Sequence, residues 1–122
     1  MFVIDDDESI CRSLRRLIKS AGFNVRTFTS ARDFLNQGCL NVSGCLVLDV
    51  KMPEMGGLEL QQRLLDVGSK MPVIFMSAHE DISTREQGLN SGAVAFLQKP
   101  FEDQVLIETV NSALSRFTDE QQ

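Results

Sequence analysis

The stretch CLVLDVKMPEMGG, residues 45–57, places a carboxylate directly after a short apolar run. The run itself, residues 45–48, has the length and composition of a strand that is buried on both faces. Asp49 follows it, and Pro53, Gly56 and Gly57 then indicate a loop. In parallel sheets, ligands bind beyond the carboxyl ends of the strands. Asp49 is therefore a candidate functional carboxylate.

Similar apolar runs recur along the rest of the chain and alternate with stretches of helical spacing. The other predicted strands span residues 1–4, 25–28, 73–76 and 94–97. Helical spacing of apolar residues covers residues 10–21, 30–37, 58–66 and 106–117, and about 82–91 with few apolar positions. Alternating strands and helices predict an α/β fold: one five-stranded parallel sheet with right-handed crossovers and helices on both faces.

Length and composition restrict the class of protein. The 122 residues suffice for one domain, and 43% hydrophobic with 24% charged residues excludes a disordered chain. No apolar stretch approaches the roughly 20 residues that span a bilayer, so we expect a cytoplasmic protein without membrane contact. The net charge of −5 disfavours direct binding of nucleic acid. Cys11, Cys39 and Cys45 form no metal-binding spacing, which predicts free thiols, no disulfide and no zinc.

Polar side chains occur at the ends of several predicted strands. Asp5 and Asp6 follow the first strand, Asp49 the third, Ser77 the fourth and Lys99 the fifth. Two like charges about 4 Å apart repel by about 4 kcal/mol at an effective dielectric of 20, and a divalent cation would remove that cost. Oxygen ligands without His or Cys favour Mg²⁺.

The acid run has a second interpretation. Acidic residues at a helix start are stabilised by the helix dipole, by roughly 0.3 to 1 kcal/mol each. We assign Asp7 and Glu8 to this role, with Asp7 as the N-cap. Asp5 and Asp6 close the strand and are better placed for a cation. Taken singly, Ser77 and Lys99 would be an ordinary strand-end hydroxyl and an ordinary surface lysine, and only their joint occurrence suggests a site.

Such a site has a specific chemistry. A carboxylate such as Asp49 attacks phosphorus when a cation neutralises the charges of acceptor and donor, and an acyl phosphate results. Lys99 would contribute a fixed positive charge to the phosphoryl oxygens, and the Ser77 hydroxyl would donate a hydrogen bond. The pattern predicts a metal-assisted phosphoryl-acceptor site.

Four blocks of sequence resemble the signature of bacterial two-component response-regulator receiver domains. They are VIDDD at residues 3–7, LDVKMPEMGG at 48–57, MSA at 76–78 and FLQKPF at 96–101. The run SAHED at 77–81 is most similar to the FixJ-type subgroup. The resemblance spans almost the whole chain and implies a flavodoxin-like, doubly wound (βα)5 fold with strand order 2-1-3-4-5.

The resemblance also implies a role for each site residue. It implies Asp49 as phosphoacceptor, with Mg²⁺ (for which Mn²⁺ could substitute) held by Asp5, Asp6, Asp49 and the Lys51 backbone carbonyl. Further implied are Lys99 as the phosphate contact, Ser77 and Phe96 as the switch pair, and a cis peptide bond between Lys99 and Pro100. The chain would then be a regulatory domain and not an enzyme, apart from its self-catalysed phosphoryl transfer and dephosphorylation. Its implied partners are a sensor histidine kinase, a second copy upon phosphorylation, and a DNA-binding output domain outside this chain.

Two features differ from the usual family pattern. Serine occupies position 77, where threonine is the commoner choice. Lys51 and His79 lie two residues beyond Asp49 and Ser77, at positions that influence dephosphorylation, so the sequence does not predict the phosphate lifetime. His79 is either a solvated loop side chain or a residue that positions water. We place the receiver domain at residues 1–117 and a polar tail or start of a linker at 118–122.

Three other classes of protein are alternatives. A magnesium-dependent phosphatase with an aspartyl intermediate would want a second acid two residues after the nucleophile, where this chain has Lys51. A dinucleotide-binding domain needs a glycine-rich turn after the first strand, where this chain has four acids at residues 5–8. A receiver-like module that binds partners without phosphorylation is the main alternative, and magnesium titration would separate it.

Overall fold

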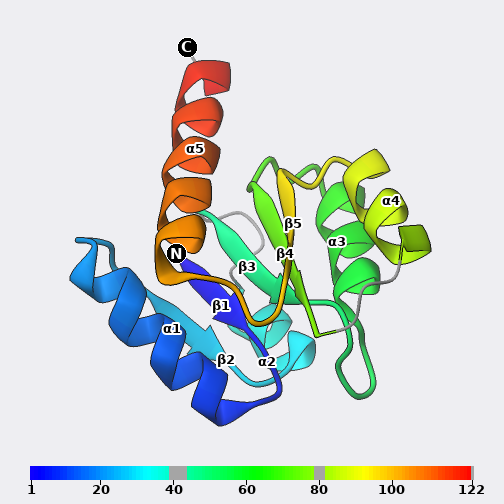
Figure 1. Ribbon diagram of the computed structural model, residues 1–122. Coiled ribbons are helices and arrows are strands. Elements are labelled where there is room, and N and C mark those ends of the chain that lie inside the picture. The colour runs from blue at the N-terminus through cyan, green and yellow to red at the C-terminus, as the bar shows by residue number, and fades with distance from the viewer. Residues whose placement is uncertain (39–43, 79–81, 122) are drawn as a thin grey trace.

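The computed structural model describes residues 1–38, 44–78 and 82–121, and its strands and helices alternate along the whole chain (Figure 1). The strands are β1 (Phe2–Ile4), β2 (Arg26–Phe28), β3 (Leu46–Asp49), β4 (Val73–Ser77) and β5 (Ala95–Gln98). The helices are α1 (Glu8–Ser20), α2 (Ala31–Asn36), α3 (Gly57–Asp66), α4 (Ile82–Asn90) and α5 (Asp103–Gln121).

The five strands form one parallel sheet in the order β2-β1-β3-β4-β5. This is the predicted flavodoxin-like topology, so the predicted fold class is confirmed. The order reverses direction between β1 and β3, and the carboxyl ends of these two central strands therefore border the crevice in which ligands of such sheets bind.

Alternating residues of the strands divide the core into two layers, one on each face of the sheet. Phe2 and Ile4 of β1 pack with α2 and α3, whereas Val3 packs with α1 and α5. In Figure 1, α1 and α5 cover one face, and α3 and α4 lie on the opposite side of the sheet. Helices on both faces were predicted and are confirmed.

The ends of α1 follow from local sequence. The Asp7 carboxylate accepts hydrogen bonds from the backbone N–H groups of Ser9 at 2.8 Å and Ile10 at 3.4 Å, which confirms Asp7 as the N-cap. At the other end, Gly22 has φ of 92° and its N–H donates to the Lys19 carbonyl at 3.0 Å. Glycine is favoured at this left-handed position that ends the helix.

Some predicted boundaries differ from the structure by one residue. The predicted strands 45–48 and 94–97 are found as Leu46–Asp49 and Ala95–Gln98. An apolar run marks burial, and Cys45 is indeed fully buried, but strand pairing begins one residue later. Asp49 is thus the last residue of β3, paired with Met76, instead of the first residue of the loop.

The structure also describes the end of the chain to residue 121 and two of the three cysteines. Helix α5 extends through residues 118–121, which the sequence marked as a polar tail. Cys11 and Cys45 are buried free thiols, while Cys39 and His79 lie outside the described residues. Among the described helices, none has the length and apolar character needed to cross a membrane.

Helix α4 packs closely against the sheet at one point. Gly88 is buried, and a Cβ atom placed there would lie 2.9 Å from the Phe75 ring of β4. The side-chain amide of Gln61 on α3 donates a hydrogen bond to the Gly88 carbonyl at 3.3 Å. Most other described residues of α4 are exposed, including Leu89 at 37%. Among the residues of α4 whose burial the structure describes, Gly88 is the one that is buried.

Candidate functional site

Three aspartates meet at the carboxyl ends of β1 and β3. Asp5 and Asp6 directly follow β1, and Asp49 is the last residue of β3. One carboxylate oxygen from each lies within 4.8 Å of the others. Asp5 and Asp49 are buried, with 1% and 6% of their surface exposed, and Asp6 is exposed. The topology therefore brings together the acids that the sequence singled out.

Lys99 reaches this cluster from the loop after β5. Its Nζ lies 2.6 Å from Oδ2 of Asp5 and 3.5 Å from Oδ1 of Asp49. The Lys99 backbone N–H donates to the Ser77 carbonyl at 2.7 Å, and the peptide bond from Lys99 to Pro100 is cis. The lysine is thus a partly buried counter-ion for two acids.

Asp5 has backbone and side-chain contacts that the sequence did not suggest. Its Oδ1 accepts a hydrogen bond from the Asp7 N–H at 2.9 Å, and its backbone carbonyl accepts one from the Cys11 thiol at 3.3 Å. With Lys99 on Oδ2, both carboxylate oxygens of Asp5 have partners. Cys11 could have been suspected only from the helical spacing that turns it toward the sheet.

Burial and like charge alter the acidity of the site. Burial, with the charge of Asp5 adding to it, raises the pKa of Asp49 from its usual 3.8 to about 6, although Lys99 opposes the change. Burial lowers the pKa of Lys99, but the hydrogen bond to Asp5 and the charge of Asp49 outweigh it, so that this pKa is raised. Lys99 is therefore charged at neutral pH, and it offsets only part of the repulsion among the acids.

The donor set fits a small, hard cation. Carboxylate oxygens are ligands that Mg²⁺ prefers, and oxygens around one octahedral Mg²⁺ lie about 3 to 4 Å apart. The separations between the three aspartate oxygens, at most 4.8 Å, are close to this range. An added positive charge would also relieve the repulsion that raises the pKa of Asp49. The three aspartates thus form a suitable site for a divalent cation.

Ser77 and Phe96 lie on adjacent strands near the same end of the sheet. Ser77 is the last residue of β4 and is buried, and its register partner is Gln98 on β5. Phe96 is half-buried and pairs with Phe75, their ring centroids being 6.1 Å apart. Since Phe75 and Ser77 are two residues apart, they project to the same face of the sheet, and Phe96 projects there too.

The last predicted metal ligand is the backbone carbonyl of Lys51. Lys51 lies in the loop after β3, two residues from Asp49, and its side chain is exposed. Nearby, a groove of about 650 Å³ runs between α1 and the β5–α5 connection. Lys99 lies at this groove, whose apolar lining includes Ile10, Leu14 and Phe101. The acid cluster therefore adjoins an apolar surface.

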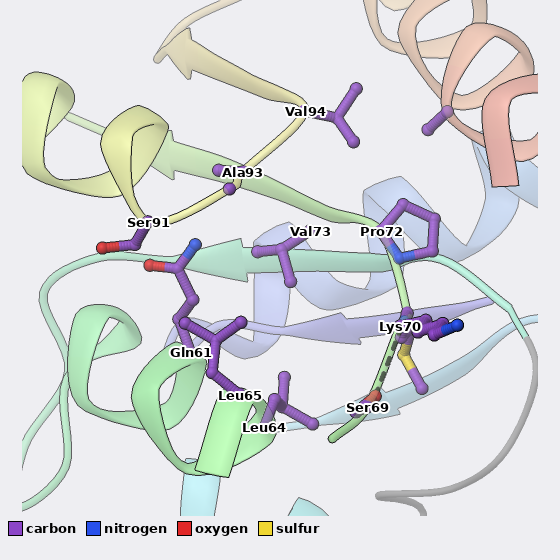
Figure 2. A pocket seen from close by; sticks show the side chains of 13 residues that line it. Gln61, Leu64, Leu65, Ser69, Lys70, Pro72, Val73, Ser91, Ala93 and Val94 are labelled. Atoms are coloured by element: carbon purple, nitrogen blue, oxygen red, sulfur yellow. Dashed lines mark hydrogen bonds between the residues drawn. The ribbon is translucent and has the colours of Figure 1, made fainter. Parts of the chain in front are cut away.

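A second cavity lies at the other end of the strands from the acid cluster (Figure 2). It has a volume of about 360 Å³ and lies where β4 and β5 begin, next to Pro72, Val73 and Val94. The Gln61 side chain projects into it from α3, with Ser91 across from it. No carboxylate lines it within the described residues, so it is separate from the acid cluster.

The sequence matches the family described as response regulator receiver domain over residues 1–111. Among curated proteins, the transcriptional regulatory protein TdiR of Thauera aromatica is 46% identical over 115 residues. That alignment covers 94% of this chain and 51% of TdiR. The chain spans about half the length of the curated relatives it matches.

Two solved structures are also similar. The response regulator StyR superposes with a TM-score of 0.91 at 42% identity, over 98% of this chain and 61% of that one. The crystal structure of FixJ-N gives a TM-score of 0.86 at 36% identity, over 93% and 91% of the two chains. Together with the family match and the acid cluster, these similarities show that the chain belongs to the receiver domains of two-component response regulators.

Proposed function

We propose that this chain is a phosphorylation-activated signalling switch. Asp49 accepts a phosphoryl group from a histidine kinase, while Asp5, Asp6, Asp49 and the Lys51 backbone carbonyl hold Mg²⁺. The observation that carries the proposal is the meeting of three aspartates with Lys99, whose Nζ is 3.5 Å from the proposed acceptor. Receiver domains bind Mg²⁺ at an aspartate cluster of this kind, and among the described residues no other group of three potential metal ligands is found.

The transfer follows from the properties of the acceptor. A carboxylate oxygen of Asp49 forms a bond to phosphorus, and the bond from phosphorus to the donor nitrogen or oxygen breaks with its electron pair leaving on the donor. The product is an acyl phosphate on Asp49. When bound, Mg²⁺ supplies positive charge that offsets the repulsion between the acceptor and the phosphoryl oxygens.

Lys99 and Ser77 stabilise the phosphorylated form. Lys99 Nζ already lies between Asp5 and Asp49, so a small movement brings it to a phosphoryl oxygen. The Ser77 hydroxyl donates a second hydrogen bond. Charge-assisted hydrogen bonds of this kind are roughly twice as strong as neutral ones.

The signal then passes to the face formed by α4 and β5. Movement of Ser77 toward the phosphoryl group vacates space into which the Phe96 ring, on the same side of the sheet, can rotate. α4 also lies on this side, where Gly88 packs against Phe75, so it can respond to the rotation of Phe96. This rearranged face is proposed to form a dimer.

The proposed partners match the surface beside the site. A kinase must bring its phosphorylated side chain to Asp49, and the apolar groove that Lys99 lines offers a docking surface there. The proposed output is transcription, because TdiR is named a transcriptional regulatory protein and this chain spans about half its length. A DNA-binding output domain would lie outside this chain.

The test is phosphoryl uptake from a small acyl-phosphate donor, measured by intact mass. We expect the wild-type protein to gain one phosphoryl group with Mg²⁺ or Mn²⁺ and none in excess chelator. The metal is required because three carboxylates repel the incoming phosphoryl oxygens.

The opposite result would favour a different function. A folded protein that binds Mg²⁺ but gains no mass, even from a histidine kinase, would be a receiver-like module that binds partners without phosphorylation. A protein that binds no Mg²⁺ at all would contradict the proposed metal site.

Phe96→Ala is expected to separate phosphorylation from its consequence. Uptake at Asp49 should stay at the wild-type level, because Phe96 is not part of the acid cluster. The phosphorylation-dependent dimer should weaken by about tenfold or more, equivalent to about 1.4 kcal/mol. Analytical ultracentrifugation with and without the acyl-phosphate donor measures both dimer constants.

Phe28→Ala is the matched control, since Phe28 is also half-buried but lies on β2 at the other edge of the sheet. It should leave the dimer constant of the phosphorylated protein unchanged. Equal dimer constants for Phe96→Ala and the wild type would refute Phe96 as the relay.

A further inference from the structure

Gly57, the first residue of α3, packs directly on the backbone of Asp49. A Cβ atom at this position would overlap the Asp49 carbonyl oxygen, and it would lie 3.1 Å from Val50 Cα and 3.2 Å from the Asp49 carbonyl carbon. Gly57 does not have a positive φ. Glycine is therefore needed here for space and not for backbone conformation.

The other described glycines have different environments. A Cβ atom at Gly88 would meet the Phe75 ring, which is a side chain and not backbone. Gly57 alone among the described glycines would bring a Cβ closer than 3.0 Å to a backbone atom. Four others have a positive φ and nothing within 4 Å of the added Cβ: Gly22, Gly38, Gly68 and Gly92.

The backbone that Gly57 contacts is held from two sides. The Val50 N–H donates to the Met76 carbonyl of β4 at 3.0 Å, and the Val50 carbonyl accepts from the Gly57 N–H at 2.8 Å. Val50 is buried at 7% exposure. A side chain at position 57 therefore cannot be accommodated by a local rotation, and either α3 or the Asp49–Val50 peptide has to move.

We propose that Gly57 is a positioning residue for phosphoryl transfer: the absence of a side chain lets α3 hold the Asp49 backbone where its carboxylate meets Lys99. This inference rests on the proposed function of Asp49 as the acceptor. Oδ1 of Asp49 lies 3.5 Å from Lys99 Nζ, and one carboxylate oxygen of Asp49 lies within 4.8 Å of an oxygen of each of the other two acids. A shift of about 1 Å in a reacting group can slow a reaction by about a hundredfold.

The test is Gly57→Ala, with the phosphorylation rate constant measured over a range of Mg²⁺ concentrations. We expect the rate constant at saturating Mg²⁺ to fall by about ten- to a hundredfold. The measurement is made in sucrose, which favours the folded state, and the folded fraction is determined for the same samples. A merely structural role would lower the rate only in proportion to the folded fraction.

Ile18→Ala is the control for destabilisation. Ile18 is fully buried near the end of α1 that lies away from the acids, so its truncation should lower stability and leave the rate of the folded protein unchanged. If Gly57→Ala does not fold even in sucrose, the phosphorylation rate of Gly56→Ala is measured in its place. Its Cβ would lie 3.0 Å from the Val50 carbonyl oxygen, a milder contact, and we expect a several-fold slower reaction.

The outcomes separate this inference from the function on which it rests. If the wild type is phosphorylated and folded Gly57→Ala reacts at the wild-type rate, or folded Gly56→Ala does so where Gly57→Ala cannot fold, Gly57 has no positioning role. If the wild type takes up no phosphoryl group, the proposed function itself fails.

Discussion

Replacing Asp49 with asparagine is expected to abolish phosphoryl uptake completely. The side-chain amide keeps the size of the carboxylate but lacks the negative charge that makes its oxygen a nucleophile. The measurement is intact mass after incubation with Mg²⁺ and a small acyl-phosphate donor.

Asp33→Asn serves as the matched control for this experiment. Asp33 is an exposed aspartate on α2, outside the acid cluster, and its replacement should leave uptake unchanged. If Asp49→Asn gained as much mass as the wild type, the acceptor would be another residue, and peptide mapping would identify it.

Replacing Lys99 with methionine is expected to lower the free energy of unfolding by about 2 to 4 kcal/mol in magnesium-free buffer. The lysine is the counter-ion for Asp5 and Asp49, whose side chains are only 1% and 8% exposed. Removing it leaves buried negative charges without compensation, whereas methionine preserves most of the packing of the side chain. Urea unfolding at neutral pH measures the difference.

The difference in stability between Lys99→Met and the wild type is expected to depend on pH. The pKa of Asp49 is already raised to about 6, and the loss of Lys99, which opposes that change, raises it further. Above the usual value of 3.8, the folded protein retains a proton that the unfolded chain releases, so stability falls as the pH rises through this range. Below about pH 6, Asp49 holds its proton in both folded proteins, so the stability deficit of Lys99→Met should be small near about pH 5 and should grow as the pH rises above about 6.

Two further variants test whether the loss of the counter-ion causes the loss of stability. Lys70→Met removes an exposed lysine that does not contact the acids and should change stability by less than about 0.5 kcal/mol. Asp49→Asn, added to Lys99→Met, should restore much of the lost stability because it removes one of the repelling charges. A Lys99→Met protein as stable as the wild type would show that the acids do not need this counter-ion.

The sequence predicted the elements of the fold well because their signals are local. The buried strands carry continuous apolar runs, α1 has apolar residues at helical spacing, and Asp7 caps it as expected. The errors lie at boundaries such as Cys45, which is buried yet precedes the strand. Burial and strand pairing are different properties, and an apolar pattern reports only burial.

The candidate site was predictable in its members but not in its contacts. Asp5, Asp6 and Asp49 follow or end strands, so the topology of a parallel sheet brings them to one edge. The sequence assigned Lys99 to the phosphoryl oxygens, and the structure adds its 2.6 Å contact with Asp5. The structure also shows that the Cys11 thiol donates a hydrogen bond to the Asp5 carbonyl and that Gly57 packs closely against the Asp49 backbone.

By itself, the sequence determined the alternation of strands and helices, their approximate ends and the residue types available for chemistry, because these depend on neighbours a few positions apart. Only the tertiary structure decided which of those residues touch. Asp5 and Lys99 are 94 positions apart in the chain, and their contact exists because β1 and β5 end at the same edge of one sheet. The burial that raises the pKa of Asp49 likewise comes from packing of the whole domain, since local sequence cannot exclude water from a strand end.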